Sequence, residues 1–187
     1  MVIRANKQVA SIVRKVVLVA VFLIVATPVL GQNAFDKFDG QEEVTSVIVN
    51  KKMFEMMSKV KVDASDKEMQ QYYHLIKKLD NLKVFTTKNA RVEADMKAAA
   101  ERYVVSANLE ELMRINDNGR SIKILVKSGA KDTQIRELLM FIDGVKGEDS
   151  VLMSLTGDFD LNEISVLTDK MRFPGGDDLR KATKGKK

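Results

Sequence analysis

The only histidine of the chain, His74, is the first residue to consider for acid–base or metal chemistry. It follows Tyr72 and Tyr73 in the segment QQYYHLIKK, whose apolar residues have helical spacing. An imidazole can act as a general base or bind a metal near neutral pH. A zinc site needs several ligands, and the chain has no second imidazole to share one. We therefore expect His74 to lie on a helix surface beside an aromatic patch.

Carboxylates occur in adjacent pairs, which could exchange a proton if both members faced one substrate. The pairs are Glu42-Glu43, Glu110-Glu111, Glu148-Asp149 and Asp177-Asp178. Adjacent residues on a strand point to opposite faces, so the members of a pair do not converge. The segment 158–162, DFDLN, has the spacing that opens a calcium loop, but it lacks the glycine at position six and the glutamate at position twelve. Asp160 is better explained as a helix cap.

The usual motifs of catalysis and cofactor binding are missing from the sequence. The absence of cysteine excludes disulfides, thiolate metal sites and cysteine nucleophiles. There is no glycine-rich phosphate loop and no G-x-S-x-G nucleophile motif. The chain also lacks tryptophan and has no basic patch interleaved with aromatics, so nucleic acid is not an expected partner. We expect no enzyme, and no catalytic, cofactor-binding or metal-binding residue.

Methionine is frequent, with ten residues, and it gathers in two helical segments. Such flexible and polarizable side chains can bind varied apolar partners, or they can fill a core. Exposed apolar patches usually mark partner sites. The candidates for a partner-binding patch are Met53, Met56, Met57, Met69, Tyr72 and Tyr73.

The first 31 residues have the features of a secretory signal peptide. A basic region precedes the uninterrupted apolar stretch Val16–Ala26, whose 11 residues suit a signal peptide and fall short of a bilayer span. Pro28 then breaks the helix, and Val29 and Gly31 suit the −3 and −1 positions of a signal peptidase. We expect cleavage between Gly31 and Gln32 and a periplasmic or secreted protein; the alternative is an uncleaved anchor. No cysteine is available for lipid attachment.

The formal net charge of +5 comes from the two ends of the chain. The predicted signal peptide holds four basic residues and no acidic one, and the segment from Lys170 onward is also strongly basic. Residues 33–169 are acidic overall, so the high pI does not indicate nucleic-acid binding by the folded part. The tail 174–187 is expected to be disordered, with at most a peripheral contact to a membrane surface. The sequence makes no prediction of oligomeric state.

The elements between these ends predict a single α+β domain over residues 44–173, after a mobile leader at 32–43 whose Phe35 and Phe38 could dock on it. We expect strands at 44–49, 82–87, 112–116, 121–127, 135–142 and 151–156. The charges in 135–142 also permit a helix there. We expect helices at 51–60, 65–79 and 90–107, and a last helix from Asp160 that buries Leu161, Ile164, Leu167 and Met171. The caps are Asn50, a Ser65–Glu68 capping box, Asn89 and Asp160. Tight turns favour a mostly antiparallel sheet of five to six strands, in β-α-α-β-α-β-β-β-β-α order, with the helices on one face.

An ordered set of segments resembles a known family. Paired phenylalanines are followed by V-T-S-V-x-V with a methionine-rich helix, and L-D-N-L-x-V leads into an alanine-rich helix. The segments E-E-L-M-x-I, D-N-G, I-K-I-L-V-K, E-L-L-M-F-I-D-G and V-L-M-S-L-T-G-D-F-D come next. From Phe35 to about Met171 the chain looks like the Bacteroidetes exported proteins of domain of unknown function 4252.

The resemblance implies a small protein of the cell envelope, encoded near extracytoplasmic-function sigma factors and their anti-sigma partners, and so an envelope-response role. It implies no catalytic residues. We expect a non-enzymatic module that binds an envelope protein. The alternatives are a small-ligand or lipid-binding module with its pocket between sheet and helices, and a hydrolase in which His74 meets a serine and a carboxylate.

Overall fold

The computed structural model describes residues 34–60, 65–117, 119–131, 133–145 and 147–164. The chain divides into two units, residues 1–32 and residues 33–187, and every described residue belongs to the second. The predicted signal peptide, its cleavage pair Gly31 and Gln32, and the tail 174–187 lie outside the described residues.

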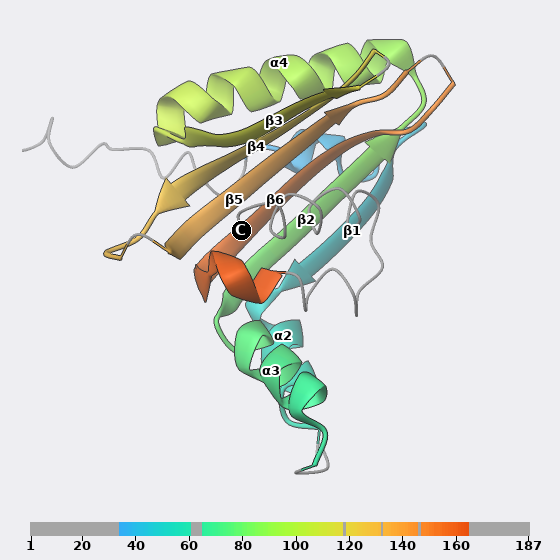
Figure 1. Cartoon of the computed structure of the whole chain (residues 1–187). Helices are drawn as coiled ribbons and strands as arrows, with labels where there is room; N and C mark the ends of the chain where they lie inside the picture. The colour runs from blue at the N-terminus through green and yellow to red at the C-terminus, as the bar shows by residue number, and fades with distance from the viewer. Residues whose placement is uncertain (1–33, 61–64, 118, 132, 146, 165–187) are drawn as a thin grey trace, which may run out of the picture. The chain divides into compact units, whose positions relative to one another are not determined.

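Six antiparallel strands form one open sheet in this second unit (Figure 1). They are β1 (Thr45–Asn50), β2 (Leu79–Thr87), β3 (Glu110–Asp117), β4 (Arg120–Ser128), β5 (Gln134–Asp143) and β6 (Ser150–Asp160). Their spatial order is β1-β2-β6-β5-β4-β3, so the last four strands form a meander that ends beside β2. The α+β class and the antiparallel sheet of up to six strands are thus confirmed.

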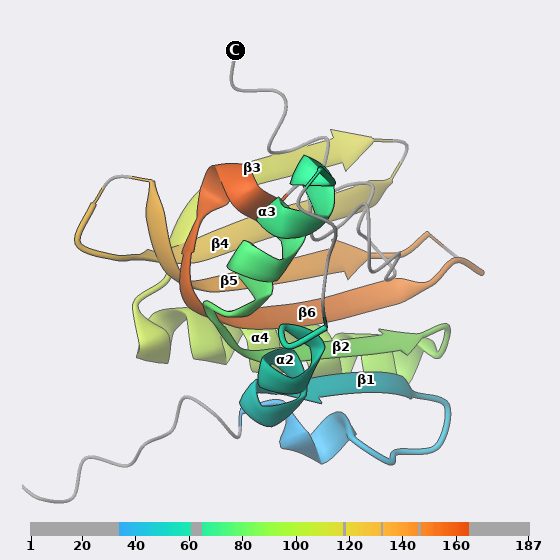
Figure 2. The same ribbon diagram turned by 90° about the horizontal axis from the view of Figure 1, so that it is seen from below.

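Helices cover both faces of the sheet, which corrects the expectation of helices on one face. The helices α2 (Lys51–Met57) and α3 (Lys67–Ile76) pack on one side, named here the α3 face, and α4 (Ala90–Ala107) packs on the other, the α4 face (Figure 2). The reason lies in the central strands, where neighbouring residues such as Leu138 and Leu139 are both fully buried but belong to different hydrophobic clusters. A sheet that is apolar on both faces needs a cover on each.

Residues 34–43 of the predicted leader are described, and Phe35 and Phe38 place this part on the α4 face. Phe35 precedes the short 3-10 helix η1 (Asp36–Phe38), Phe38 ends it, and the two side chains are 3% and 0% exposed. Phe38 packs against Phe85 of β2, with ring centroids 5.9 Å apart. Asp36 also forms an ion pair with Lys83. The docking of the two phenylalanines was anticipated, and it is what fixes the segment.

Most helix starts follow the predicted caps. Asn50 accepts a hydrogen bond from the Met53 amide at 3.0 Å, and Asn89 caps α4. The cap of α3 is Asp66, one residue after the predicted Ser65. Asp160 forms a capping box with Glu163, but it opens the 3-10 helix η2 (Leu161–Glu163). Leu167 and Met171 lie outside the described residues.

Gly157 lies where two main chains come close together at the end of the sheet. It lies opposite Leu79, where the chain leaves α3 to enter β2, and the adjacent Asp158 amide donates to the Lys78 carbonyl at 2.9 Å. A Cβ atom on Gly157 would lie 2.3 Å from the Lys78 carbonyl oxygen and 2.9 Å from the Leu79 Cα. Both are backbone atoms, so no side-chain rotation can relieve the overlap.

We therefore expect Gly157→Ala to lower the free energy of unfolding by roughly 1–3 kcal/mol, because the two strands must move apart locally. Urea denaturation measures this loss. Gly129→Ala is the matched control, since its Cβ would meet only the Gln134 side chain, which can rotate. Equal losses in the two variants would contradict the explanation.

One carboxylate is buried beneath α4. Glu137 of β5 is 7% exposed, and its Oε1 has no hydrogen-bond partner. Burial raises the pKa of Glu137, and the hydrogen bond with the Tyr103 hydroxyl of α4 and the charge of Lys127 oppose the rise only in part. Burial, together with the same hydrogen bond, raises the pKa of Tyr103.

The sign of the resulting pH effect follows from linkage. The pKa of Glu137 is higher in the folded state than in the unfolded state. Its contribution to the free energy of unfolding is therefore most favourable below the unfolded-state pKa, and it declines as the pH rises through the folded-state pKa. Glu137→Gln removes the titration, so we expect it to raise the free energy of unfolding at pH 7 by on the order of 1 kcal/mol. The gain should shrink towards pH 4, as measured by thermal or urea unfolding. Glu110→Gln, at an exposed position, is the control; a pH-independent gain would contradict the assignment.

Candidate interaction surface

The sheet is open, so β1 and β3 each pair with one neighbour only. Unpaired edge strands can recruit a strand from another chain, and charged side chains along an edge discourage this. β3 has that protection, because Glu110, Glu111 and Arg114 lie within it. β1 has the sequence TSVIVN, with no charge, proline or glycine. Of the two edges, β1 is the one suited to pairing.

Exposed apolar side chains gather in β1 and in the helix that follows it. Val47 and Ile48 of β1 are 43% and 42% exposed. Met53 and Met56 of α2 are 49% and 55% exposed, and Val60 just beyond the helix is 58% exposed. These five residues, named here the β1–α2 surface, make up most of the large exposed apolar side chains in the described part of the chain.

The structure divides the predicted methionine–tyrosine patch between surface and core. Met53 and Met56 are exposed, as a partner site requires. Met57, Met69 and Tyr73 are partly buried against the hydrophobic cluster of the α3 face. Tyr72 is 7% exposed and belongs to that cluster, so it cannot contribute to an exposed patch.

Sequence reasoning missed Val47 and Ile48 as surface residues. A β-branched run indicates a strand, but it does not show whether the strand lies at the centre or at an edge. The available signal was the contrast between this uncharged strand and the charged strand at 110–117.

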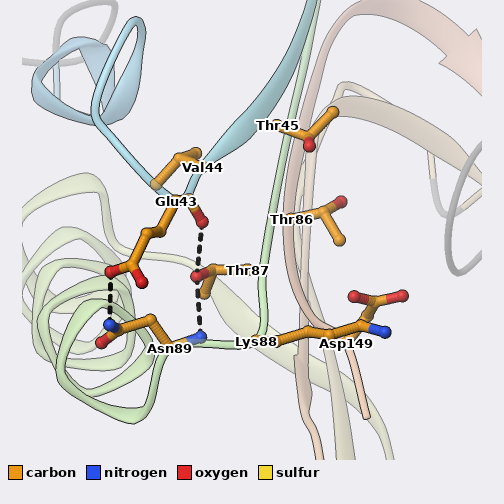
Figure 3. Close-up of a pocket in the computed structure, with 8 residues that line it drawn as sticks. All are labelled: Glu43, Val44, Thr45, Thr86, Thr87, Lys88, Asn89 and Asp149. Atoms are coloured by element: carbon orange, nitrogen blue, oxygen red, sulfur yellow. Dashed lines mark hydrogen bonds between the residues drawn. The ribbon is translucent and has the colours of Figure 1, made fainter. Parts of the chain in front are cut away.

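A polar hollow of about 680 Å³ lies where β1 begins, β2 ends and α4 starts (Figure 3). The Thr87 hydroxyl donates to the Glu43 carbonyl at 2.8 Å and accepts from the Asn89 amide at 3.1 Å, while the Asn89 side chain binds the Glu43 carboxylate. Thr45, Thr86, Lys88 and Asp149 complete the lining. The described lining residues include no imidazole, and Glu43, Thr87 and Asn89 among them are bonded to one another.

An apolar groove of about 300 Å³ opens on the α4 face, between α4 and strands β3 to β5. Its walls are Ala100, Val104, Val105, Leu125 and Phe141, and its rim carries Lys97, Glu101, Glu111 and Lys123. The volume is at the lower end of ligand pockets. A small apolar or amphiphilic molecule is the class of ligand that this lining would take.

The groove ends near a cluster of charged side chains that sequence spacing did not reveal. The hydrogen bond with Asp143 and, to a lesser extent, burial raise the pKa of Glu93 on α4. The same hydrogen bond and the Lys97 ammonium lower the pKa of Asp143 at the end of β5. Because the pKa of Glu93 is raised and that of Asp143 is lowered, Glu93 is the donor whenever the pair holds one proton. Ser150 beside them is fully buried and accepts from the Gly144 amide at 3.0 Å, so the cluster ties α4 to the β5–β6 turn.

His74 lies on α3, beside a hollow of about 650 Å³. Its Nε2 is 3.9 Å from Glu163 Oε1, and Lys78 Nζ lies 2.8 Å from the same oxygen. The other described residues that line the hollow are Lys67, Gln70, Gln71 and Asn162, and none is a serine. Among the described residues, His74 thus lies near a carboxylate, and no serine lines the hollow beside it.

In the described ranges, no three His, Asp or Glu side chains come together in a way that could hold a metal ion. Among the residues that the structure describes, no helix combines the length and apolar composition needed to span a bilayer.

Comparison with known proteins gives one result. The family described as a domain of unknown function, DUF4252, matches residues 38–167, a range that contains all six strands. No curated protein and no solved structure matches the chain at a significant level. The likeness indicated by the ordered sequence segments is confirmed at the level of this domain family: the chain belongs to the DUF4252 family.

Proposed function

We propose that this protein is exported to the cell envelope and acts there by binding another protein through the β1–α2 surface. The observation that carries the proposal is the gathering of exposed apolar side chains in one stretch, 47–60, along an unprotected sheet edge. Exposed apolar groups of this kind mark interaction sites, because covering them releases water from apolar surface.

The two parts of the surface supply different kinds of contact. The free edge of β1 offers backbone donors and acceptors to an added strand, which is a common mode of peptide recognition. The side chains of Met53 and Met56 lie one helical turn apart on α2 and offer flexible apolar contacts. Together they suit a partner that presents an extended segment flanked by apolar side chains.

Export is supported by the N-terminal sequence, where four basic residues precede the 11-residue apolar stretch Val16–Ala26. Placement among Bacteroidetes envelope proteins and in an envelope response rests on the resemblance of the ordered sequence segments. The polar side chains of the described residues support binding over catalysis, because the main clusters are bonded internally or buried.

The export proposal predicts that the chain recovered from cells begins at Gln32. Intact-mass measurement of protein from the envelope fraction tests this. Leu23→Arg puts a charge in the apolar stretch, so we expect that variant to keep residues 1–31 and to accumulate inside the cell. Recovery of the unaltered chain from the cytosol with Met1 in place would contradict the proposal.

The surface proposal predicts that Met53→Gln with Met56→Gln reduces recovery of the bound partner at least several-fold, because the apolar contact is lost while both side chains stay solvated. The measurement is cross-linking in cells, followed by purification of the tagged chain and quantification of the cross-linked product. Unfolding temperatures should match those of the unaltered protein, since both side chains are exposed.

Val105→Gln provides the matched control, because Val105 is 82% exposed on α4 and lies outside the β1–α2 surface. Val105 also lines the apolar groove. The apolar lining of this groove favours a second candidate function, the binding of a small apolar ligand. If recovery fell with Val105→Gln and not with the methionine variant, the β1–α2 surface would be the wrong site and the groove the better one.

A further inference from the structure

We propose that the apolar groove on the α4 face binds a single-chain amphiphile with an anionic headgroup, such as a fatty acid. This inference rests on the second candidate function, because it names the class of ligand that the same groove takes, and it does not depend on the β1–α2 surface. In this arrangement the acyl chain lies between α4 and strands β3 to β5. The headgroup lies at the end of the groove that carries Lys97 and Lys123.

Apolar side chains from the helix and from the sheet form the walls that hold the acyl chain. Ala100 and Val104 are four residues apart on α4, so they lie on the same side of the helix, one turn apart. Leu125 of β4 and Phe141 of β5 form the wall on the sheet, and both belong to the hydrophobic cluster of the α4 face. The volume of about 300 Å³ suits one acyl chain better than the two chains of a phospholipid.

The two ammonium groups of the rim lie at the same end of the groove. Lys97 Nζ lies 2.5 Å from Asp143 Oδ2. Hydrogen bonds with Glu93 and Lys97, and the nearby charge of Lys123, lower the pKa of Asp143. Val104 lies about two helical turns further along α4 than Lys97, towards the other end. The groove therefore has its basic groups at one end and apolar walls beyond them, a pattern that an anionic amphiphile complements.

Lys123 is the cation that remains for a ligand. The carboxylate of Asp143 is already bonded to Lys97 and to Glu93, and Glu93 is the donor when the pair holds one proton. Among the described residues, Lys123 makes no hydrogen bond or ion pair, and it is half-buried beside the groove. With Glu93 neutral, two ammonium groups share one carboxylate at this end. A ligand carboxylate supplies the second counter-charge.

Neither acidic residue of the rim is bound to Lys123. Glu111 is bound to the Arg114 guanidinium by two hydrogen bonds. Glu101 is exposed on α4, one turn beyond Lys97. Asp143 raises the pKa of Lys97, and Glu101 contributes less to that rise. Because Lys123 attracts an anionic headgroup and Glu101 repels it, their removal should change binding in opposite directions.

Dodecanoate is the probe, used below the concentration at which it forms micelles, and methyl NMR spectra of the purified chain are the measurement. We expect saturable shifts of the Val104, Val105 and Leu125 methyl signals. The signals of Val47 and Ile48, which lie in the β1–α2 surface, should stay unchanged. Dodecyltrimethylammonium has the same chain length with a cationic headgroup, so we expect it to bind at least about fivefold more weakly.

Removal of single rim charges tests where the headgroup lies. Lys123→Gln should weaken dodecanoate binding about fivefold, because the ion pair with the headgroup is lost. Glu101→Gln should strengthen binding by a smaller factor, because a repulsion is removed. Lys77→Gln, at an exposed position after α3, is the control for net charge and should leave the affinity unchanged. Urea denaturation verifies that each variant is folded.

The apolar wall is tested separately by Val105→Gln. Val105 is 82% exposed, so the change should spare the fold while it removes an apolar contact with the acyl chain and weakens binding several-fold. Val47→Gln, the same change on β1, is the matched control and should have no effect on the affinity for dodecanoate.

Equal affinity for the two headgroups, or an unchanged dodecanoate affinity in Lys123→Gln, would overturn the anionic class of ligand. The second candidate function would then stand if Val104 and Leu125 still shifted. Shifts confined to Val47 and Ile48 would overturn the groove as the site. Absence of any saturable shift would overturn this inference together with the second candidate function. The partner proposal would be unaffected, since its own test is the loss of cross-linked product in the methionine variant.

Discussion

The burial of the central strands on both faces is the constraint from which the rest of the fold follows. In β2, β5 and β6, neighbouring residues such as Val84 and Phe85, or Leu152 and Met153, are buried in different hydrophobic clusters. Each fully buried side chain of this size contributes roughly 1.5–3 kcal/mol relative to exposure. Neither face can be left to water, so each must receive a helical layer. The chain supplies α2 and α3 before β2, α4 after it, and η1 at the start (Figures 1 and 2).

The connection through α4 also decides which strands lie at the edges. It carries the chain from β2, next to one edge, to β3 at the other, and the meander then returns to β6 beside β2. β1 is left outermost, and no later strand in the described part of the chain covers it. An edge strand has unpaired backbone groups by necessity, and here it is also uncharged and leads directly into a helix with exposed methionines. The fold therefore places unpaired backbone groups and exposed apolar side chains in one region.

Polar groups elsewhere mainly hold the layers together. Glu137 and Tyr103 join β5 to α4 beneath the helix, and Glu93, Lys97 and Asp143 join α4 to the end of β5. Glu43, Thr87 and Asn89 join the leader to the start of α4 (Figure 3). Side chains that are committed to one another in this way are poorly placed to act on a substrate. Besides the β1–α2 surface, the described residues form a small apolar groove and two larger hollows lined mainly by polar side chains.

The sequence by itself determined the local elements, since they depend on neighbouring residues. Asn50 and Asn89 cap helices, and alternation in 121–127 predicts β4. Tertiary structure alone decided the faces and the edges. A bulge between Ile135 and Glu137 shifts the alternation, so Ile135 packs on the α3 face and Glu137 is buried on the other. Tyr72 and Met53 both belong to runs of apolar residues at helical spacing. Tyr72 is nevertheless buried in the core, whereas Met53 is exposed at the surface. Which side of a helix meets the sheet, and which strand has no outer neighbour, are set by residues far apart in sequence, so no local pattern contains that information.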